Sequence, residues 1–233
     1  MPAPDDSDLL ALWELGLPRH PVDRALTLAS WARPDLPADR LPELPLGSLN
    51  AALLRLREGW FGPEVPAVAD CPGCGARNEL FLDVGELLSV CPEGDERGRL
   101  EAGGMSFRPP NSRDLAAIAT EPDADRSVMT LLARCLVSDA SADLGSLVSE
   151  VEAGLEELDP AASFEIELQC SACGADWADS LEVAGLLWDE VDARVRLLLG
   201  QIHVLAAGYG WTESEILALS PRRRALYAEM ASA

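Results

Sequence analysis

The chain has 233 residues, of which 48% are hydrophobic, and this is enough apolar material for the core of one large domain or two small ones. Its 40 acidic and 18 basic residues give a net charge of -22 at pH 7, a field that repels nucleic acid and acidic membrane surfaces. All the basic residues are arginine, which excludes a Schiff-base lysine and the lysine of a phosphate-binding loop. We therefore expect a folded protein whose partners are proteins.

Neither end of the chain carries the pattern of a targeting or membrane segment. The start, Met1-Pro-Ala-Pro-Asp-Asp, lacks the basic stretch and apolar run of a signal peptide. The longest apolar stretch, residues 195–207, is interrupted by Arg196, Gln201 and His203 and is not a membrane span. The sequence predicts a protein that is cytoplasmic at synthesis and does not insert into a membrane.

An N-terminal helical segment is predicted over residues 1–62. Its first helix ends before Pro18, its second begins at Pro21, and its third begins near Ser48, a plausible N-cap. The stretch from 33 to 46 is too rich in proline for a helix and predicts an extended surface connection. Its prolines are Pro34, Pro37, Pro42 and Pro45.

One short motif occurs twice, as Cys71-Pro-Gly-Cys74-Gly75 and as Cys170-Ser-Ala-Cys173-Gly174, 99 positions apart. At the same offset Leu82 matches Leu181 and Val84 matches Val183, so the chain contains two copies of one small unit. A strand precedes each cysteine pair and an alternating, strand-like stretch follows it. These copies define a first half-site, residues 63–90, and a second, residues 163–182.

Two Cys-x-x-Cys turns supply the four thiolates that a tetrahedral zinc ion requires, and the glycine after each second cysteine relieves the backbone where amides turn towards sulfur. We predict one structural zinc site whose ligands are Cys71, Cys74, Cys170 and Cys173. The two halves are separated by about 95 residues, far more than the 15 to 20 of a compact ribbon, so the site must close across a long insertion.

A redox dithiol is the competing interpretation of these cysteines, because the spacing of Cys71-Pro-Gly-Cys74 also suits redox chemistry. A redox pair normally begins a helix, whereas here the following residues are strand-like, which favours metal. Four thiolates would leave no open position for water, so the zinc would support folding and not hydrolysis. From the sequence alone, we expect its removal to loosen the entire fold.

Between the half-sites, the segment 91–162 is predicted to hold a hairpin over 99–108 with Gly103-Gly104 at its tip, and then three helices from Ser112 to Leu158. The segment 183–233 is predicted to hold one long amphipathic helix and two short ones. The long helix covers about 181–207 and ends at Gly210, and Thr212 with Glu215 forms a capping box. The predicted class is α+β, mainly helical, with a small zinc-ribbon-like antiparallel sheet built from the two cysteine turns.

Outside the half-sites, no group of residues indicates catalysis. Cys91 and Cys135 are expected to be unpaired thiols, and no nucleophile signature surrounds His20 or His203, the two histidines. We expect His203 to make a buried or partner-facing hydrogen bond, and no enzymatic activity. Trp211 is either a core residue or an interface anchor. The cluster Arg222-Arg223-Arg224 is either an exposed helix start or a docking site for an acidic partner.

Several stretches together resemble the baseplate-hub assembly proteins of contractile phage tails and of related phage-tail-like contractile injection systems. The C-terminal stretches are the most specific. The matching segments are 44–47, 53–57, 61–62, the two cysteine turns, 187–190, 202–206, 209–211, 215–219, and 223–227. The resemblance implies a non-enzymatic protein that helps build, or is incorporated into, the baseplate or hub, with other particle proteins as partners. It implies no catalytic residues.

Two functions therefore compete. The first is a structural or assembly protein, either a chaperone or an adaptor, of a tail-like particle. The second is a zinc-ribbon DNA-binding regulator, since the segment around Arg222 faintly resembles a helix-turn-helix, although the charge of -22 opposes DNA binding. A dithiol redox protein comes third.

Overall fold

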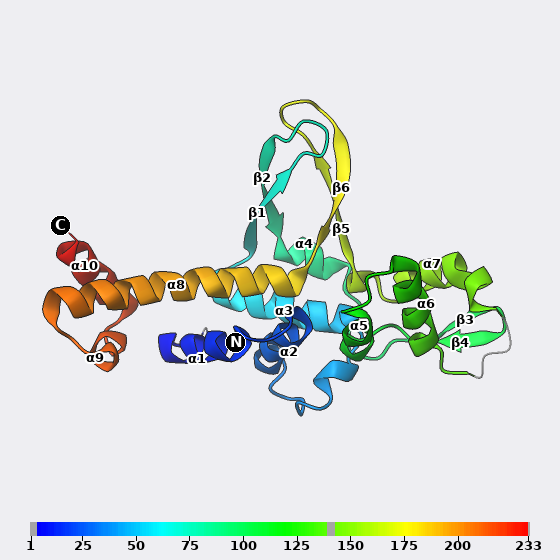
Figure 1. The fold of residues 1–233 in the computed structure, drawn as a ribbon, viewed down its shortest axis with the longest axis horizontal. Coiled ribbons are helices and arrows are strands. Elements are labelled where there is room, and N and C mark those ends of the chain that lie inside the picture. The colour runs from blue at the N-terminus through cyan, green and yellow to red at the C-terminus, as the bar shows by residue number, and fades with distance from the viewer. Residues whose placement is uncertain (1–3, 139–142, 233) are drawn as a thin grey trace.

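The computed structural model describes residues 4–138 and 143–232. Residues 1–3 and residues 139–142 lie outside this part. The first group belongs to the N-terminus that was compared with a signal peptide, and the second belongs to the insertion. Within it the chain is mainly helical, with small antiparallel two-stranded sheets, so the predicted α+β class is confirmed. A long helix forms the axis of the molecule, and two β-hairpins project from it as an arm (Figure 1). None of the helices described is long and apolar enough to cross a bilayer.

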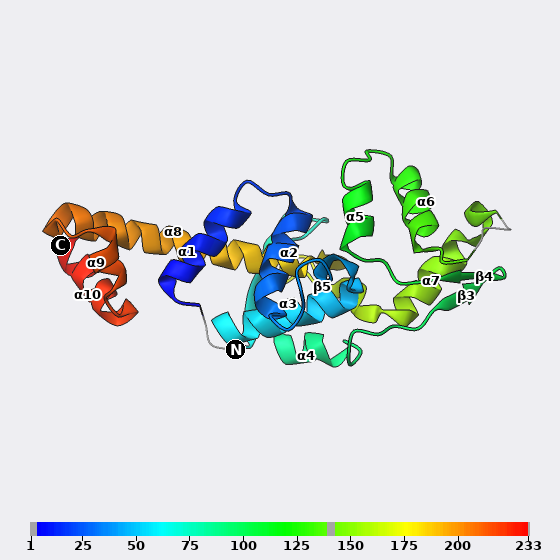
Figure 2. The same ribbon diagram turned by 90° about the horizontal axis from the view of Figure 1, so that it is seen from below.

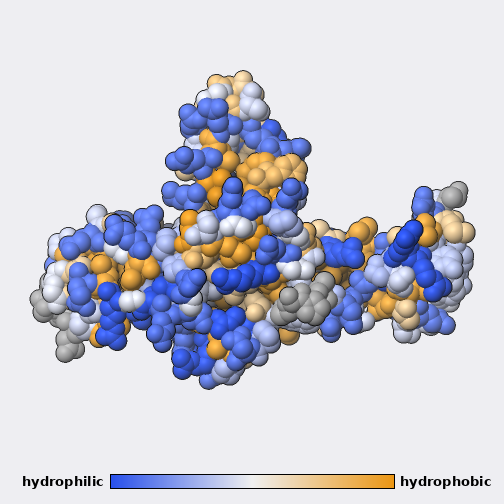
Figure 3. Space-filling model, turned by 180° about the vertical axis from the view of Figure 1, so that it is seen from behind, coloured by the Kyte–Doolittle hydropathy of each residue, from blue (hydrophilic) through white to orange (hydrophobic). Residues whose placement is uncertain are grey.

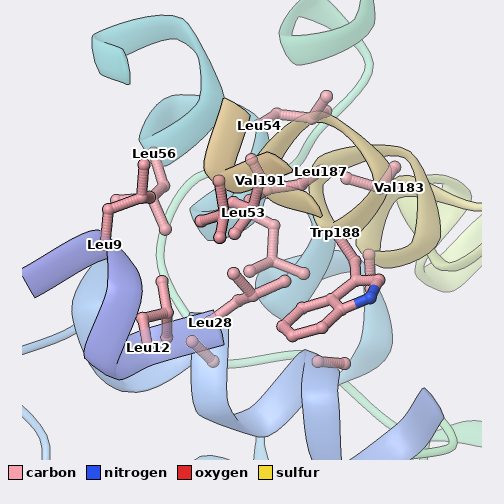
Figure 4. Close-up of a cluster of buried hydrophobic side chains, with 14 of the residues drawn as sticks. Leu9, Leu12, Leu28, Leu53, Leu54, Leu56, Val183, Leu187, Trp188 and Val191 are labelled. Atoms are coloured by element: carbon pink, nitrogen blue, oxygen red, sulfur yellow. The ribbon is translucent and has the colours of Figure 1, made fainter. Parts of the chain in front are cut away.

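The N-terminal helices pack with the first half of the long helix in one core (Figure 4). This core joins both ends of the sequence, because residues before position 62 and after position 182 contribute to it. The most deeply buried members include Leu28, Leu53, Leu187 and Val191, each 0% exposed. The helices are α1 (Asp6–Gly16), α2 (Pro21–Ala32), α3 (Leu46–Phe61) and α8 (Val183–Tyr209).

Trp188 fixes how closely α1 approaches α8. The indole ring lies against the backbone of Gly16, where a Cβ atom would overlap it, so glycine is required at this position. The Arg24 guanidinium stacks over the same ring, 5.0 Å from its centroid, and Trp13 Nε1 donates to Asp192 at 2.8 Å. The packing of α1 and α2 on α8 is therefore specific as well as apolar.

The third helix begins earlier than predicted. It starts at Leu46 with Pro45 in the N-cap position, so the assignment of Ser48 as N-cap is wrong. The carboxylate of Asp159 supplies the missing acceptor: the Gly47 amide donates to its Oδ2 at 2.9 Å. Arg97 donates to the other oxygen at 2.9 Å, and both charged side chains are almost fully buried. A carboxylate 112 residues away thus replaces the local cap.

The proline-rich connection is not simply a surface strand. It contains a 3-10 turn, Leu41–Glu43, and the side chains of Leu41 and Leu44 are buried in the core. Prolines prevent an α-helix here. Burial of the leucine side chains between them is still favourable in free energy, so the connection is anchored to the core.

The insertion has a core of its own. The predicted hairpin and three helices are confirmed as β3 and β4 and as α5, α6 and α7. Phe107, Cys135 and Val151, each 0% exposed, lie in this second core. The bounds are β3 (Leu100–Ala102), β4 (Met105–Phe107), α5 (Ser112–Ile118), α6 (Ala124–Cys135), the 3-10 helices Leu144–Leu147 and Pro160–Ala162, and α7 (Val148–Leu158).

The far end of α8 carries the C-terminal helices α9 (Glu213–Leu217) and α10 (Pro221–Ala231), at the opposite end of the molecule from the insertion (Figure 2). The predicted capping box of Thr212 and Glu215 is confirmed. Arg224 is buried and donates to Gln201 and to Asp6, so this cation joins α10 to α8 and α1. The interpretation of the cluster as an exposed helix start therefore holds for Arg222 and Arg223 and not for Arg224.

The arm consists of two hairpins, each followed by a helix. The first is β1 (Glu64–Asp70) and β2 (Arg77–Asp83), leading into α4 (Val84–Ser89); the second is β5 (Phe164–Gln169) and β6 (Asp176–Leu181), leading into α8. Each hairpin is its own two-stranded sheet, so the two cysteine turns do not share a single ribbon sheet. The apolar side chains between the hairpins include Leu80, Leu82, Ile166 and Leu168.

Leu187→Ala tests the central core. The side chain is 0% exposed, so its truncation is expected to lower the free energy of unfolding by about 2–5 kcal/mol. Leu197→Ala on the same helix is the control, because that side chain is 57% exposed and its loss is expected to change stability by about 0.5 kcal/mol or less. Urea unfolding followed by circular dichroism measures both, and equal effects would contradict the assignment of this core.

Arg97→Met tests the buried ion pair at the start of α3. It leaves the carboxylate of Asp159, 0% exposed, without its cation, so we expect a loss of about 3–5 kcal/mol. Arg40→Met is the matched control, since the Arg40–Glu43 pair lies in water and is worth about 1 kcal/mol at most. Thermal unfolding should separate the two variants clearly, and an unchanged melting temperature for the Arg97 variant would rule out this role.

Candidate metal centre

The tip of the arm brings the four predicted cysteines together. Their sulfur atoms all lie within 4.8 Å of one another. The Sγ atoms of Cys71 and Cys173 are 3.7 Å apart, and those of Cys74 and Cys170 are 3.6 Å apart, so the closest pairs join the two hairpins. This arrangement of side chains could hold a metal ion.

The two turns have the same backbone geometry. In the first, Cys71 N donates to Ala76 O at 2.9 Å and Gly75 N donates to Cys71 O at 2.8 Å; in the second, the corresponding distances for Cys170 and Gly174 are both 2.9 Å. Gly75 and Gly174 adopt φ values of +72° and +74°, a left-handed conformation that favours glycine, as predicted. The duplication in the sequence is therefore a duplication of local structure.

Burial also repeats between the two turns. The first cysteine of each pair, Cys71 or Cys170, is 2% exposed, whereas the second, Cys74 or Cys173, is exposed. The second residue of each turn thus lies at the surface, although its sulfur atom still faces the other three. A metal ion at their centre would be partly shielded from water and would still be reachable by a chelator.

Asn78 fixes the register between the hairpins, and the sequence-based analysis missed this role. Its side-chain amide donates to Ala76 O at 2.9 Å, and its Oδ1 accepts from both the amide and the hydroxyl of Ser171 at 3.0 Å. Its Nδ2 also lies 3.9 Å from Cys170 Sγ. A polar residue at an inward-facing position of β2 could have suggested this role. The sequence does not reveal its partner, Ser171, because that residue lies 93 positions away.

The pKa values of Cys170 and Cys74 are shifted in opposite directions. Hydrogen bonds from the amides of Cys173 and Ala172 to Cys170 Sγ lower the pKa of Cys170 to about 6. The Ala76 amide lowers the pKa of Cys74, but contacts with the thiols of Cys173 and Cys170, together with burial, outweigh it and raise the value to about 12. The Cys170 thiolate is therefore stabilised by the backbone, and its proximity opposes ionisation of Cys74. A bound cation would remove that opposition.

The centre lies at the tip, whereas the base of the arm is anchored independently. Val65 and Phe164, at the beginning of the two hairpins, belong to the main core. Below the arm, Arg57 at the end of α3 donates to both carboxylate oxygens of Glu190 on α8, at 2.9 and 2.6 Å. These contacts anchor the base of the arm without the thiols, which favours a local effect of metal removal over the loosening of the entire fold that the sequence alone predicts.

The remaining sequence candidates lie elsewhere. Cys91 is half-buried, Cys135 is in the second core, and burial raises the pKa of Cys91 and raises that of Cys135 to about 11. His20 Nδ1 accepts from the Val22 amide as an N-cap, and His203 is exposed, so a buried role for His203 is wrong. Trp211 stacks on Tyr209, with ring centroids 4.8 Å apart, and thus packs internally.

Comparison with protein-family models, with curated proteins and with solved structures gave no match to this chain.

Removing the metal from the loaded protein with a chelator should open the arm and leave the helical core intact. Four additional thiols should become accessible to a chromogenic thiol reagent, while Cys135 reacts slowly because it is buried in the second core. The helical signal in circular dichroism should stay nearly constant. Collapse of that signal on chelation would show that the core depends on the metal after all.

Proposed function

We propose that the four cysteines hold a structural zinc ion. Zinc bound to four thiolates has Zn–S distances of about 2.3 Å in a tetrahedron, which requires sulfur atoms about 3.8 Å apart. The closest sulfur pairs, at 3.6 and 3.7 Å, are near this value. They are far longer than a disulfide bond of about 2.05 Å. This agreement is the observation that carries the proposal.

The proposed role of the zinc is to fasten the tips of the two hairpins. Four protein ligands complete a tetrahedral shell, so the ion would have no position for a substrate or an activated water. Cys71 and Cys74 come from one sheet and Cys170 and Cys173 from another, so one ion replaces the backbone hydrogen bonds that the two sheets do not exchange at their tips. The proposed zinc ion would therefore cross-link the two hairpins, and the protein would have no enzymatic activity.

We further propose that the protein assembles with others in the baseplate or hub of a contractile, phage-tail-like particle, as an adaptor or chaperone made in the cytoplasm. The resemblance of the C-terminal segment supports this, as does the elongated form, in which an insertion, an arm and a helical end are presented at separate places (Figure 1). The charge of -22 favours protein partners over nucleic acid. Because Arg224 is buried, the basic cluster offers Arg222 and Arg223 to solvent, which further weakens the DNA-binding alternative.

Metal analysis of the purified chain tests the zinc. We expect one zinc per chain in the wild type and less than about a tenth of that in Cys74→Ser, since three thiolates bind far more weakly than four. Cys91→Ser is the control and should keep one zinc, because Cys91 Sγ donates to Leu87 O and not to the centre. A wild-type protein that contains no metal, and whose thiols titrate freely, would favour the redox alternative.

Co-expression with the sheath, tube, baseplate and spike proteins of a contractile particle tests the assembly role. We expect the chain to co-purify with a baseplate or hub component, and to give no mobility shift with duplex DNA at moderate salt. If the chain binds none of these proteins but shifts the mobility of duplex DNA, the assembly proposal is wrong and the DNA-binding regulator takes its place.

A further inference from the structure

The outer face of the first hairpin exposes an apolar patch, defined here as Pro66, Val68 and Phe81. Phe81 is 73% exposed and Val68 is 57% exposed, and Pro66 lies directly opposite Phe81 in the β1–β2 register. The side chains that face the second hairpin alternate with them along each strand and are less exposed. Figure 3 shows apolar surface on the projecting arm among hydrophilic residues.

The second hairpin shows that the fold does not require this patch. At the offset of 99 positions, the residues that correspond to Pro66, Val68 and Phe81 are Glu165, Glu167 and Ser180. All three are exposed, so the same outer face is polar in one copy of the unit and apolar in the other.

The inward faces behave differently, because they are mainly apolar in both copies, with Asn78 in one and Asp179 in the other as the exceptions. Val65 corresponds to Phe164 at the base of the arm, and Leu82 corresponds to Leu181 between the hairpins. Burial thus accounts for the inward apolar residues. Val68 borders the groove between the hairpins but stays largely exposed, and Phe81 is still more exposed, so burial within the described chain does not explain the outward ones. A large exposed aromatic on a hairpin with unpaired edges invites non-specific association, a disadvantage that is normally removed unless the residue is used.

The charges around the patch define what can cover it. The outer face of the same hairpin also carries four carboxylates, those of Glu64, Asp70, Glu79 and Asp83. One cation, Arg77, lies among them, and its Nε is 3.5 Å from the Asp70 carboxylate. An apolar centre within an acidic border complements a segment that has an apolar side chain between lysines or arginines.

We propose that the Pro66–Val68–Phe81 patch is the docking site for a basic, apolar segment of a partner protein. This inference rests on the proposed assembly function and specifies the chemistry of one partner. A second copy in a symmetric dimer would place two acidic borders face to face, which opposes self-association through this patch. The zinc-fastened tip would hold the hairpin rigid, so that binding costs little ordering of the arm.

Selection of random 12-residue peptides displayed on phage, against the immobilised zinc-loaded full chain, tests the proposal. We expect enriched peptides to carry arginine or lysine on both sides of an aliphatic or aromatic residue. The best of these, synthesised with a fluorescent label, should bind Phe81→Ser about ten-fold or more weakly than the wild type. Its affinity should also fall as salt rises, because the border is acidic.

Glu167→Ala on the second hairpin is the matched control and should bind the peptide as the wild type does, since it lies on the outer face that lacks the patch. Zinc content and melting temperature should be unchanged in Phe81→Ser, because that side chain is largely exposed. These readouts keep a failure of docking distinct from a failure of the zinc site.

Three results would overturn the docking proposal. The first is enrichment without a bias towards basic residues, and the second is equal peptide affinity for the wild type and Phe81→Ser. The third is a dimer of the wild type in analytical ultracentrifugation that Phe81→Ser abolishes, because the occupant would then be a second copy of this chain. Selection that enriches no peptide above background would also count against it.

Discussion

Burial of the apolar stripe of α8 against the N-terminal helices is the constraint on which the rest of the structure depends. Leu187 and Val191 enter the same core as Leu28 and Leu53, so the packing joins segments from opposite ends of the sequence. Since β1 leaves the end of α3 and β6 leads into the start of α8, this packing also places the two hairpins side by side. The convergence of the four thiols is a consequence of the core, and not its cause.

Features whose partners are close in sequence could be predicted, and those whose partners are distant could not. The cysteine turns, the glycine at position 75 and the Thr212 capping box follow from local spacing, and each was found where it was expected. The carboxylate of Asp159 at the start of α3, the buried Arg224 and the bridge from Asn78 to Ser171 each join residues more than 20 positions apart. No periodicity reports such pairs, because only the folded chain brings their charges and dipoles together.

Comparison of the two copies of the duplicated unit distinguishes the residues that the fold of the arm requires from those that it does not. Both hairpins keep the glycine turn, the two thiols and a mainly apolar inward face, and these are the elements that build the arm. They differ at the outward positions, where Phe81 in one copy corresponds to Ser180 in the other. Internal repeats of this kind provide a comparison within a single chain, because both copies experience the same solvent and the same scaffold.

The independent anchoring of the two hairpin bases has a kinetic consequence for metal uptake. Because the bases are fixed by the core, the cysteine pairs are confined near each other at a high effective concentration before any ion arrives. Loading of the proposed site would therefore require ordering of the tips alone and not of the whole chain. The apoprotein could fold before it binds the ion. The supply of metal would then determine when the arm becomes rigid, but not whether the core is folded.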